Sequence, residues 1–198
     1  MRTWVLIATA ALLVPACGGG THLKQADLAK IMPSAADAPA ATQLDTSNVG
    51  VMTLEQLVTD NAVRAELKKL HYRVGYVATF ATPNYIPDAA KAPLGSALYA
   101  TSAIVFQDTE DARRGFAFYE KRLRSRADDF APLLMKGIGE ELIAFRFSSL
   151  DDTPLPGLAI QWRRGNALFS VVGVGNPGPM QDIVKGLART IDERARKA

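Results

Sequence analysis

Five segments of the chain carry the hydrophobic pattern of β-strands. From Tyr72 to Phe80 every second residue is apolar or aromatic, so these residues share one face of a strand. The segment Ala97–Phe106 is apolar on both faces, as expected of a strand in the middle of a sheet. Three further strands are predicted nearer the C-terminus, at Leu142–Phe147, Leu158–Arg164 and Ala167–Val174.

A capping box predicts a helix before the first strand. Thr53 is the cap and Gln56 follows three residues later, and the helix is expected to extend to about Leu70. Its apolar residues form two stripes instead of one. The helix is therefore either broken near Asp60-Asn61 or packed between two surfaces.

Two other helices have single apolar stripes. Asp108 caps the first, with Asp111 at its third position, and the second starts at Pro179, a good residue for a first helical turn. One or two helical turns are also expected at residues 25–31, whereas residues 33–48 have no sustained period and indicate a loop.

The order of these elements predicts the fold class. The last two strands are separated only by Gly165-Asn166, a dipeptide typical of a tight hairpin, and short connections of this kind favour antiparallel pairing. We therefore expect an α+β domain, with a mainly antiparallel sheet of about five strands packed with two or three helices.

The N-terminus has the pattern of an export signal. Arg2 is followed by eleven apolar or small residues, Trp4–Val14, which are too few to span a bilayer as a helix. The next residues complete the segment Val14-Pro15-Ala16-Cys17, which resembles the lipobox of bacterial lipoproteins. Cys17 is also the one cysteine of the chain, which rules out an intramolecular disulfide.

The lipobox resemblance implies cleavage before Cys17 and diacylglycerol on its sulfur. The chain would then be anchored by lipid to a membrane, on the extracytoplasmic side, because two or more acyl chains bind stably. Residues 1–16 would be the signal peptide, residues 17–50 a tether and irregular segment, and residues 51–198 a single domain. The alternative is an ordinary secretory signal with a chance cysteine.

The folded part resembles, in a general way, the extracytoplasmic sensor-like domains of actinobacterial lipoproteins and receptor kinases. The resemblance lies in the alternation of strands, an alanine-rich helix and the Arg-Gly-Asn hairpin. It implies a sensing or binding role but assigns no individual residues.

Composition and motifs argue against several functions. The net charge of +3 is too small for a nucleic-acid-binding surface. The two histidines, His22 and His71, lack the spacing of a zinc site, and no serine lies in a nucleophile elbow. Gly173–Gly178 matches a dinucleotide-binding motif, but Pro177 and Pro179 remove backbone donors from the turn and no further strand follows. We therefore expect no metal, no cofactor and no catalytic residues.

The remaining candidate surface is electrostatic. Arg113, Arg114, Lys121 and Arg124 fall within about a third of the circumference of one helix. On an anchored domain this face would contact anionic lipid headgroups or an acidic partner. The alternative is an ordinary solvated helix face.

These observations favour a non-catalytic binding or sensing module that contacts an envelope protein or a small ligand. A second hypothesis is a carrier of lipid or another apolar ligand, which predicts a cavity of several hundred Å³ between sheet and helices. The third is an enzyme, which predicts that His71 or a carboxylate lies in a cleft with a perturbed pKa.

Overall fold

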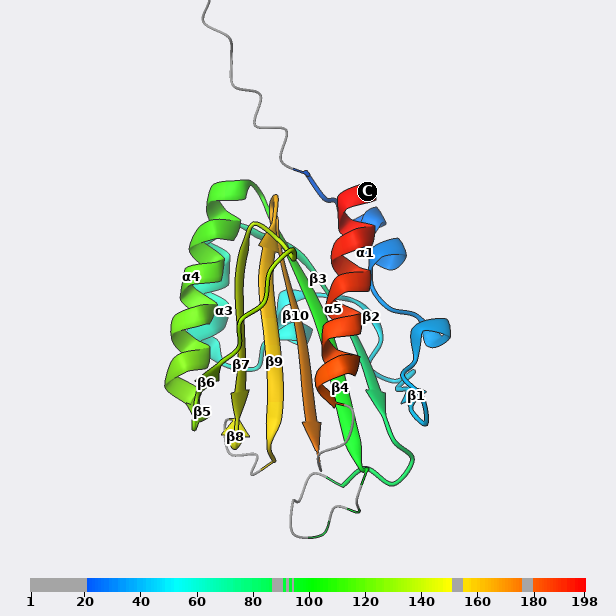
Figure 1. The fold of residues 1–198 in the computed structure, drawn as a ribbon. Helices are drawn as coiled ribbons and strands as arrows, with labels where there is room; N and C mark the ends of the chain where they lie inside the picture. The colour runs from blue at the N-terminus through cyan, green and yellow to red at the C-terminus, as the bar shows by residue number, and fades with distance from the viewer. Residues whose placement is uncertain (1–20, 87–90, 92, 94, 151–154, 176–179) are drawn as a thin grey trace, which may run out of the picture.

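The computed structural model describes residues 21–86, 91, 93, 95–150, 155–175 and 180–198. Its centre is an antiparallel sheet in the order β1-β3-β4-β10-β9-β7-β6, with β2 also paired to β3 (Figure 1). The strands of this sheet are β1 (Gln43–Leu44), β2 (Gly50–Met52), β3 (Tyr72–Ala81), β4 (Ala97–Phe106), β6 (Ala131–Pro132), β7 (Glu141–Phe147), β9 (Gly157–Arg164) and β10 (Ala167–Gly175). Two short strands, β5 (Ala127–Asp128) and β8 (Ser149–Leu150), form a separate pair.

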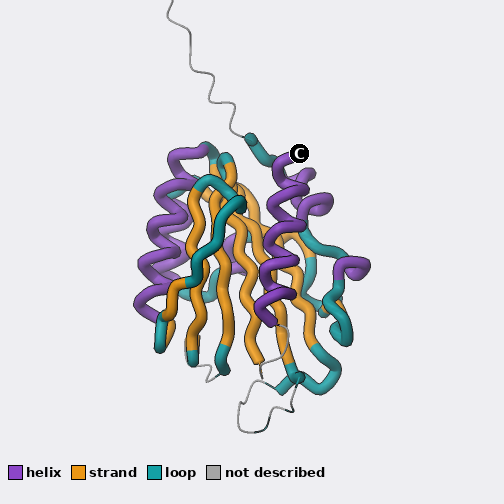
Figure 2. Tube along the Cα trace, in the orientation of Figure 1, coloured by secondary structure: helices purple, strands orange, loops and turns teal. Residues whose placement is uncertain are grey.

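Helices cover both faces of the sheet (Figure 2). On one face lie α1 (Gln25–Ile31) and α5 (Met180–Lys197), and on the other lie α2 (Leu54–Leu57), α3 (Asn61–Lys69) and α4 (Thr109–Arg126). A short 3-10 turn, η1 (Ala35–Asp37), follows α1. The alternation of side chains along each strand gives each face its own hydrophobic core.

The predicted α+β class and the antiparallel sheet are confirmed. The five predicted strands correspond to β3, β4, β7, β9 and β10. In the part of the chain that the structure describes, the main sheet has eight strands, which are these five and three short ones. The three additional strands are only two or three residues long, which is too short for an alternating pattern to show.

The segment after Thr53 forms two helices, so the first of the two open alternatives is correct. The Thr53 hydroxyl and the Gln56 amide form the predicted capping box at the start of α2. Asp60 then caps α3, because its carboxylate accepts hydrogen bonds from the backbone N–H groups of Ala62 (2.8 Å) and Val63 (3.2 Å). The two apolar stripes thus belong to two separate helices.

The hairpin after β9 binds the N-terminal segment. Gly165 has a φ of +55°, which suits the first central residue of a type II′ turn. Asn166 is completely buried, and its side chain binds both backbone groups of Leu23, at 2.7 and 3.1 Å, and the carbonyl of Phe106, at 3.0 Å. The N-terminal segment therefore runs along the end of the sheet that carries this hairpin.

The larger core includes residues from before Gly50. Leu23, Leu28, Ile31 and Met32 are all buried against the face that α5 covers. Both described core clusters lie between residues 23 and 195, so a chain that begins at Thr21 contains all of the described core.

Candidate functional site: a groove between the helices and the sheet

The floor of the site is a row of side chains that crosses four strands. Val77 on β3 pairs with Ser102 on β4, Ser102 pairs with Ser170 on β10, and Ser170 pairs with Gln161 on β9. Directly paired residues project from the same face of a sheet. Three polar side chains therefore lie side by side in the middle of the sheet, on the face that α2, α3 and α4 cover.

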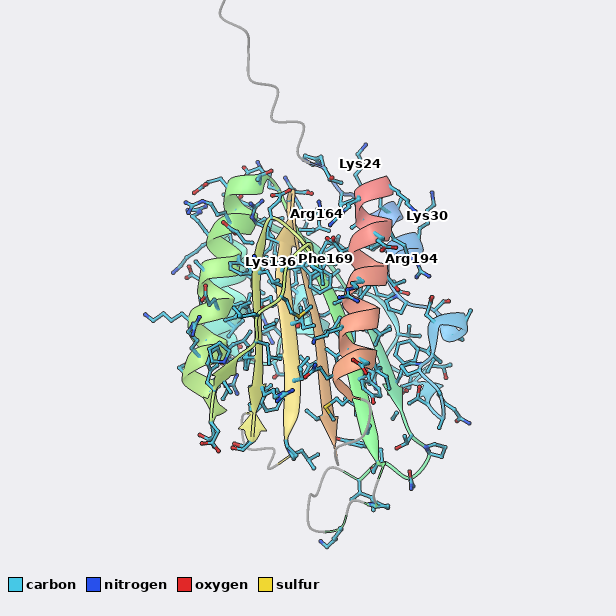
Figure 3. The ribbon with its side chains drawn as sticks, in the orientation of Figure 1. Lys24, Lys30, Lys136, Arg164, Phe169 and Arg194 are labelled. Atoms are coloured by element: carbon cyan, nitrogen blue, oxygen red, sulfur yellow. The ribbon has the colours of Figure 1, made fainter. Side chains whose placement is uncertain are left out.

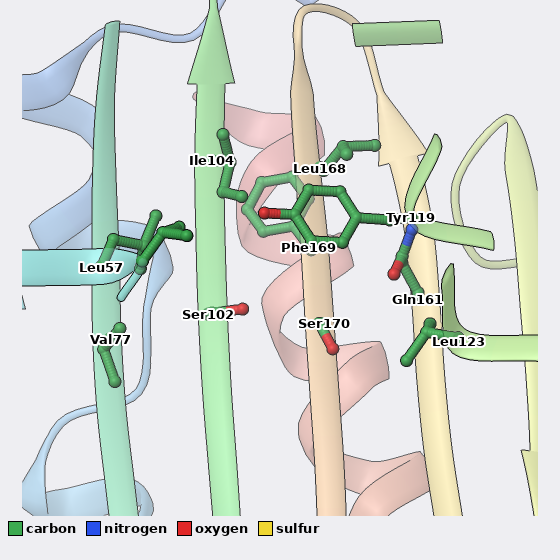
Figure 4. A pocket seen from close by; sticks show the side chains of 11 residues that line it. Leu57, Val77, Ser102, Ile104, Tyr119, Leu123, Gln161, Leu168, Phe169 and Ser170 are labelled. Atoms are coloured by element: carbon green, nitrogen blue, oxygen red, sulfur yellow. The ribbon is translucent and has the colours of Figure 1, made fainter. Parts of the chain in front are cut away.

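Two helices form the walls of a groove above this row. Leu57 and Val58 stand at the end of α2, and Tyr119 and Leu123 project from the second half of α4. Figure 4 shows Leu57 on one side of the floor and Leu123 on the other. The space between them is about 320 Å³, at the lower end of the range for small-molecule sites. The lining residues are Leu57, Val58, Val77, Ser102, Ile104, Tyr119, Leu123, Gln161, Leu168, Phe169 and Ser170.

The groove exists because α4 packs closely on the sheet only in its first half. The buried residues of α4 are Asp111, Ala112, Gly115 and Phe116, all before its midpoint. A Cβ at position 115 would lie 2.7 Å from the Phe106 ring, so glycine is what allows this close approach. The side chains in the second half of α4 are partly buried or exposed, and the groove lies beneath this half.

One ion pair connects the two walls. Arg122 on α4 donates to the Asp60 carboxylate at 2.8 Å, and this carboxylate also caps α3. These hydrogen bonds together lower the pKa of Asp60, with the backbone donors of Val63 and Ala62 contributing most. Asp60 therefore stays ionised, and its pairing with Arg122 holds the α2–α3 wall close to α4.

The groove is lined by uncharged side chains. Among the described lining residues only Tyr119 titrates, and its burial raises its pKa to about 12. Its phenol is therefore protonated at neutral pH. The groove can offer hydrogen bonds from a phenol, two serine hydroxyls and one amide, but it offers no ionic contact.

The polar floor was missed by the sequence reading. Ser102 lies in the segment interpreted as an apolar central strand, and Ser170 and Gln161 lie in the two strands of the predicted hairpin. Polar side chains at central positions of otherwise apolar strands were the available signal. The three residues become neighbours only through the order of the strands in the sheet. The periodicity of residues along one strand does not reveal that order.

None of the four residues of the predicted basic face lines the groove, and the predicted lipid site cannot be compared with it. Residues 1–20, with the lipobox and Cys17, are outside the described residues. On α4, Arg113 pairs with Glu110, Arg114 with Asp111 and Arg124 with Glu120, while Lys121 lies on the same helix. Each of these arginines thus has an acidic neighbour on its own helix. Contact of this face with lipid or an acidic partner stays a prediction.

His71 lies outside the groove and has a buried partner. It follows α3 with a φ of +48°, and its Nδ1 lies 2.8 Å from an Asp111 carboxylate oxygen. Burial alone would raise the pKa of Asp111, but hydrogen bonds from Arg114 and His71 lower it below its usual value. The imidazole side chain is 58% exposed. This pair ties the end of α3 to the first turn of α4.

Glu140 and Glu141 both form ion pairs with Arg163. Both carboxylates contact Arg163 on the neighbouring strand, Glu140 at 2.5 Å and Glu141 at 2.9 Å. Glu141 is the first residue of β7, and Glu140 immediately precedes the strand. The buried Arg163 guanidinium is therefore paired with two carboxylates.

The glycine motif at residues 173–178 is only partly described. Gly173 and Gly175 belong to β10, and residues 176–178 lie outside the described residues. A Cβ on Gly173 would lie 2.6 Å from the Val184 side chain, so this glycine allows α5 to cross the sheet closely. In the described ranges, no three His, Cys, Asp or Glu side chains are grouped so that they could hold a metal ion.

Comparisons with known proteins identify a fold but no family. No family model matches the chain, and no curated protein matches its sequence. Among solved structures the chain is similar to the extracellular domain of PknH from Mycobacterium tuberculosis, with 11% identity and a TM-score of 0.61. The match covers 91% of this chain and 100% of that domain. At the level of fold, the expected resemblance to an actinobacterial extracytoplasmic domain is confirmed. Of the helices that the structure describes, none has the length and apolarity to cross a membrane.

Proposed function

We propose that this protein is an extracytoplasmic, non-catalytic module that binds or senses a small apolar molecule in the groove between α2, α4 and the sheet. The groove itself carries this proposal, because it has the volume of a small-molecule site and mostly apolar walls. Two observations support the extracytoplasmic address. The fold is shared with an extracellular domain, and the leader resembles a lipoprotein signal.

The groove volume favours a small ligand over a bulky lipid. At about 320 Å³ the groove is near the lower limit for drug-sized ligands and well below the 1,000 Å³ of the largest such sites. Carriage of a lipid with two long acyl chains, as the carrier hypothesis allows, would need a larger space. Recognition of one compact molecule is therefore the better match.

A fluorescence titration tests the groove as a binding site. A chain of residues 21–198, which contains the whole described core, is titrated with the uncharged apolar dye N-phenyl-1-naphthylamine. Ser170→Phe fills the floor and Leu123→Trp fills a wall, so each is expected to weaken dye binding at least tenfold. Ser125→Phe places the same ring on an exposed part of α4 and serves as the control.

Circular dichroism and the melting temperature show whether each variant is folded. If the native chain does not bind the dye, or if both groove variants bind it as the control does, the proposed site is wrong.

We also propose the lipid anchor on Cys17, on the basis of the lipobox resemblance. In the native host, mass spectrometry of the membrane fraction is expected to find residue 17 at the mature N-terminus with diacylglycerol attached. Cys17→Ser is expected to leave the protein without this lipid. An unmodified thiol on the native protein would refute the anchor and would leave the groove proposal untouched.

A further inference from the structure

One polar group in the floor of the groove lacks a hydrogen-bond partner. Gln161 is only 4% exposed, and its Nε2 has no partner among the described residues. Figure 4 shows the amide among the groove side chains. A buried amide donor loses its hydrogen bonds to water, so folding is disfavoured unless some other group replaces them.

The residues next to Gln161 in the floor are also polar. Ser170 and Ser102 continue the same row across β10 and β4, so one end of a ligand would meet an amide and two hydroxyls together. Around this polar row the lining is aliphatic and aromatic. A matching ligand is therefore apolar over most of its length and polar at one point.

The lining of the groove also indicates the charge of the polar group of the ligand. None of the described lining residues is acidic or basic, and the nearby Arg122 is already paired with Asp60. A carboxylate or ammonium group buried here would lose its hydration without gaining an opposite charge. The polar end of the ligand should therefore be neutral.

We propose that the groove recognises an uncharged, mainly apolar molecule with a carbonyl or ester oxygen, which accepts a hydrogen bond from Gln161 Nε2. This inference rests on the proposed function and adds the chemical class of the ligand. The groove has about twice the volume of an apolar cavity of about 150 Å³ that holds benzene, so the ligand has on the order of 12 non-hydrogen atoms.

Three probes of equal size separate the possibilities by competition with the dye. Methyl nonanoate is neutral and has an ester, decanoate is charged, and hexylbenzene has no carbonyl. Methyl nonanoate is expected to bind at least tenfold more tightly than decanoate. Gln161→Leu removes the amide at nearly constant volume, and it is expected to weaken methyl nonanoate about fivefold while leaving hexylbenzene unchanged.

The control is Gln43→Leu, the same substitution on exposed β1 of the same sheet, which should alter neither affinity. As a measurement without mutation, the side-chain ¹⁵N–¹H resonances of Gln161 should shift with methyl nonanoate and not with hexylbenzene. If both neutral probes bind but Gln161→Leu changes them by the same factor, or the Gln161 resonances do not respond, the ligand class is wrong and the groove remains a binding site. If no probe binds, the proposed function fails as well.

Discussion

The contact between Asn166 and Leu23 is expected to be a main attachment of the N-terminal segment. Asn166→Ala removes the amide oxygen that accepts from Leu23 N–H and the amide nitrogen that donates to two carbonyls. No other residue can take over these contacts without moving, because the side chain is fully buried in the hairpin.

The magnitude follows from the three hydrogen bonds. Each buried backbone group that loses its partner costs about 1–3 kcal/mol, and water that enters at the end of the sheet offsets part of this. Taking about 1 kcal/mol for each group, Asn166→Ala should lower the free energy of unfolding by about 3 kcal/mol. That is a large part of the 5–15 kcal/mol typical of a domain.

Urea denaturation followed by circular dichroism measures this loss. Asn48→Ala is the matched control, because the amide of Asn48 is exposed and bonds only near residues in sequence. Its effect should stay within about 0.5 kcal/mol. In Asn166→Ala the Leu23 amide should also exchange its hydrogen faster than the amides of β4. A loss of less than 1 kcal/mol, with Leu23 still protected, would refute this account of how the segment is held.

Two other predictions concern pH and packing. Arg194 on α5 (Figure 3) pairs with Asp37. The hydrogen bond from Arg194 and the smaller contributions of Ser34 lower the pKa of Asp37 from 3.8 to about 2. Because the pKa of Asp37 is lower in the folded than in the unfolded state, the pair stabilises the protein above about pH 4, and this stabilisation is lost as the pH falls towards 2. Asp37→Asn should therefore reduce the acid dependence of the free energy of unfolding between pH 4 and 2 by about 1 kcal/mol, after allowance for solvent screening. Gly157→Ala places a Cβ 2.5 Å from the Gly173 carbonyl oxygen and should lower stability by about 3 kcal/mol in thermal denaturation. The Cβ that Gly186→Ala adds to α5 has no atom within 4 Å, so this substitution should instead stabilise the protein by about 0.5–1 kcal/mol. Equal effects of the two substitutions would contradict the packing argument.

For the candidate site, the sequence predicted the strands and helices that form the groove but not how they are arranged in space. The carrier hypothesis anticipated a cavity of several hundred Å³ between sheet and helices, and the groove has this size and place. It did not identify Ser102, Ser170 or Gln161. These residues are 68 positions apart at most in the chain and become neighbours only through the pairing of β4 with β10 and of β10 with β9.

The sequence alone determined the long strands, the helix caps and the hairpin, because these depend on local chemistry. The pattern of apolar residues located the five long strands, Asp108 capped α4 through a hydrogen bond from Asp111 N–H, and Gly165-Asn166 formed the hairpin. Each of these features depends on residues within a few positions of one another, so the pattern is complete in the sequence. Tertiary structure decided the strand order and the docking of Leu23 on Asn166. It also decided the open groove under α4, because all of these depend on which distant surfaces bury one another.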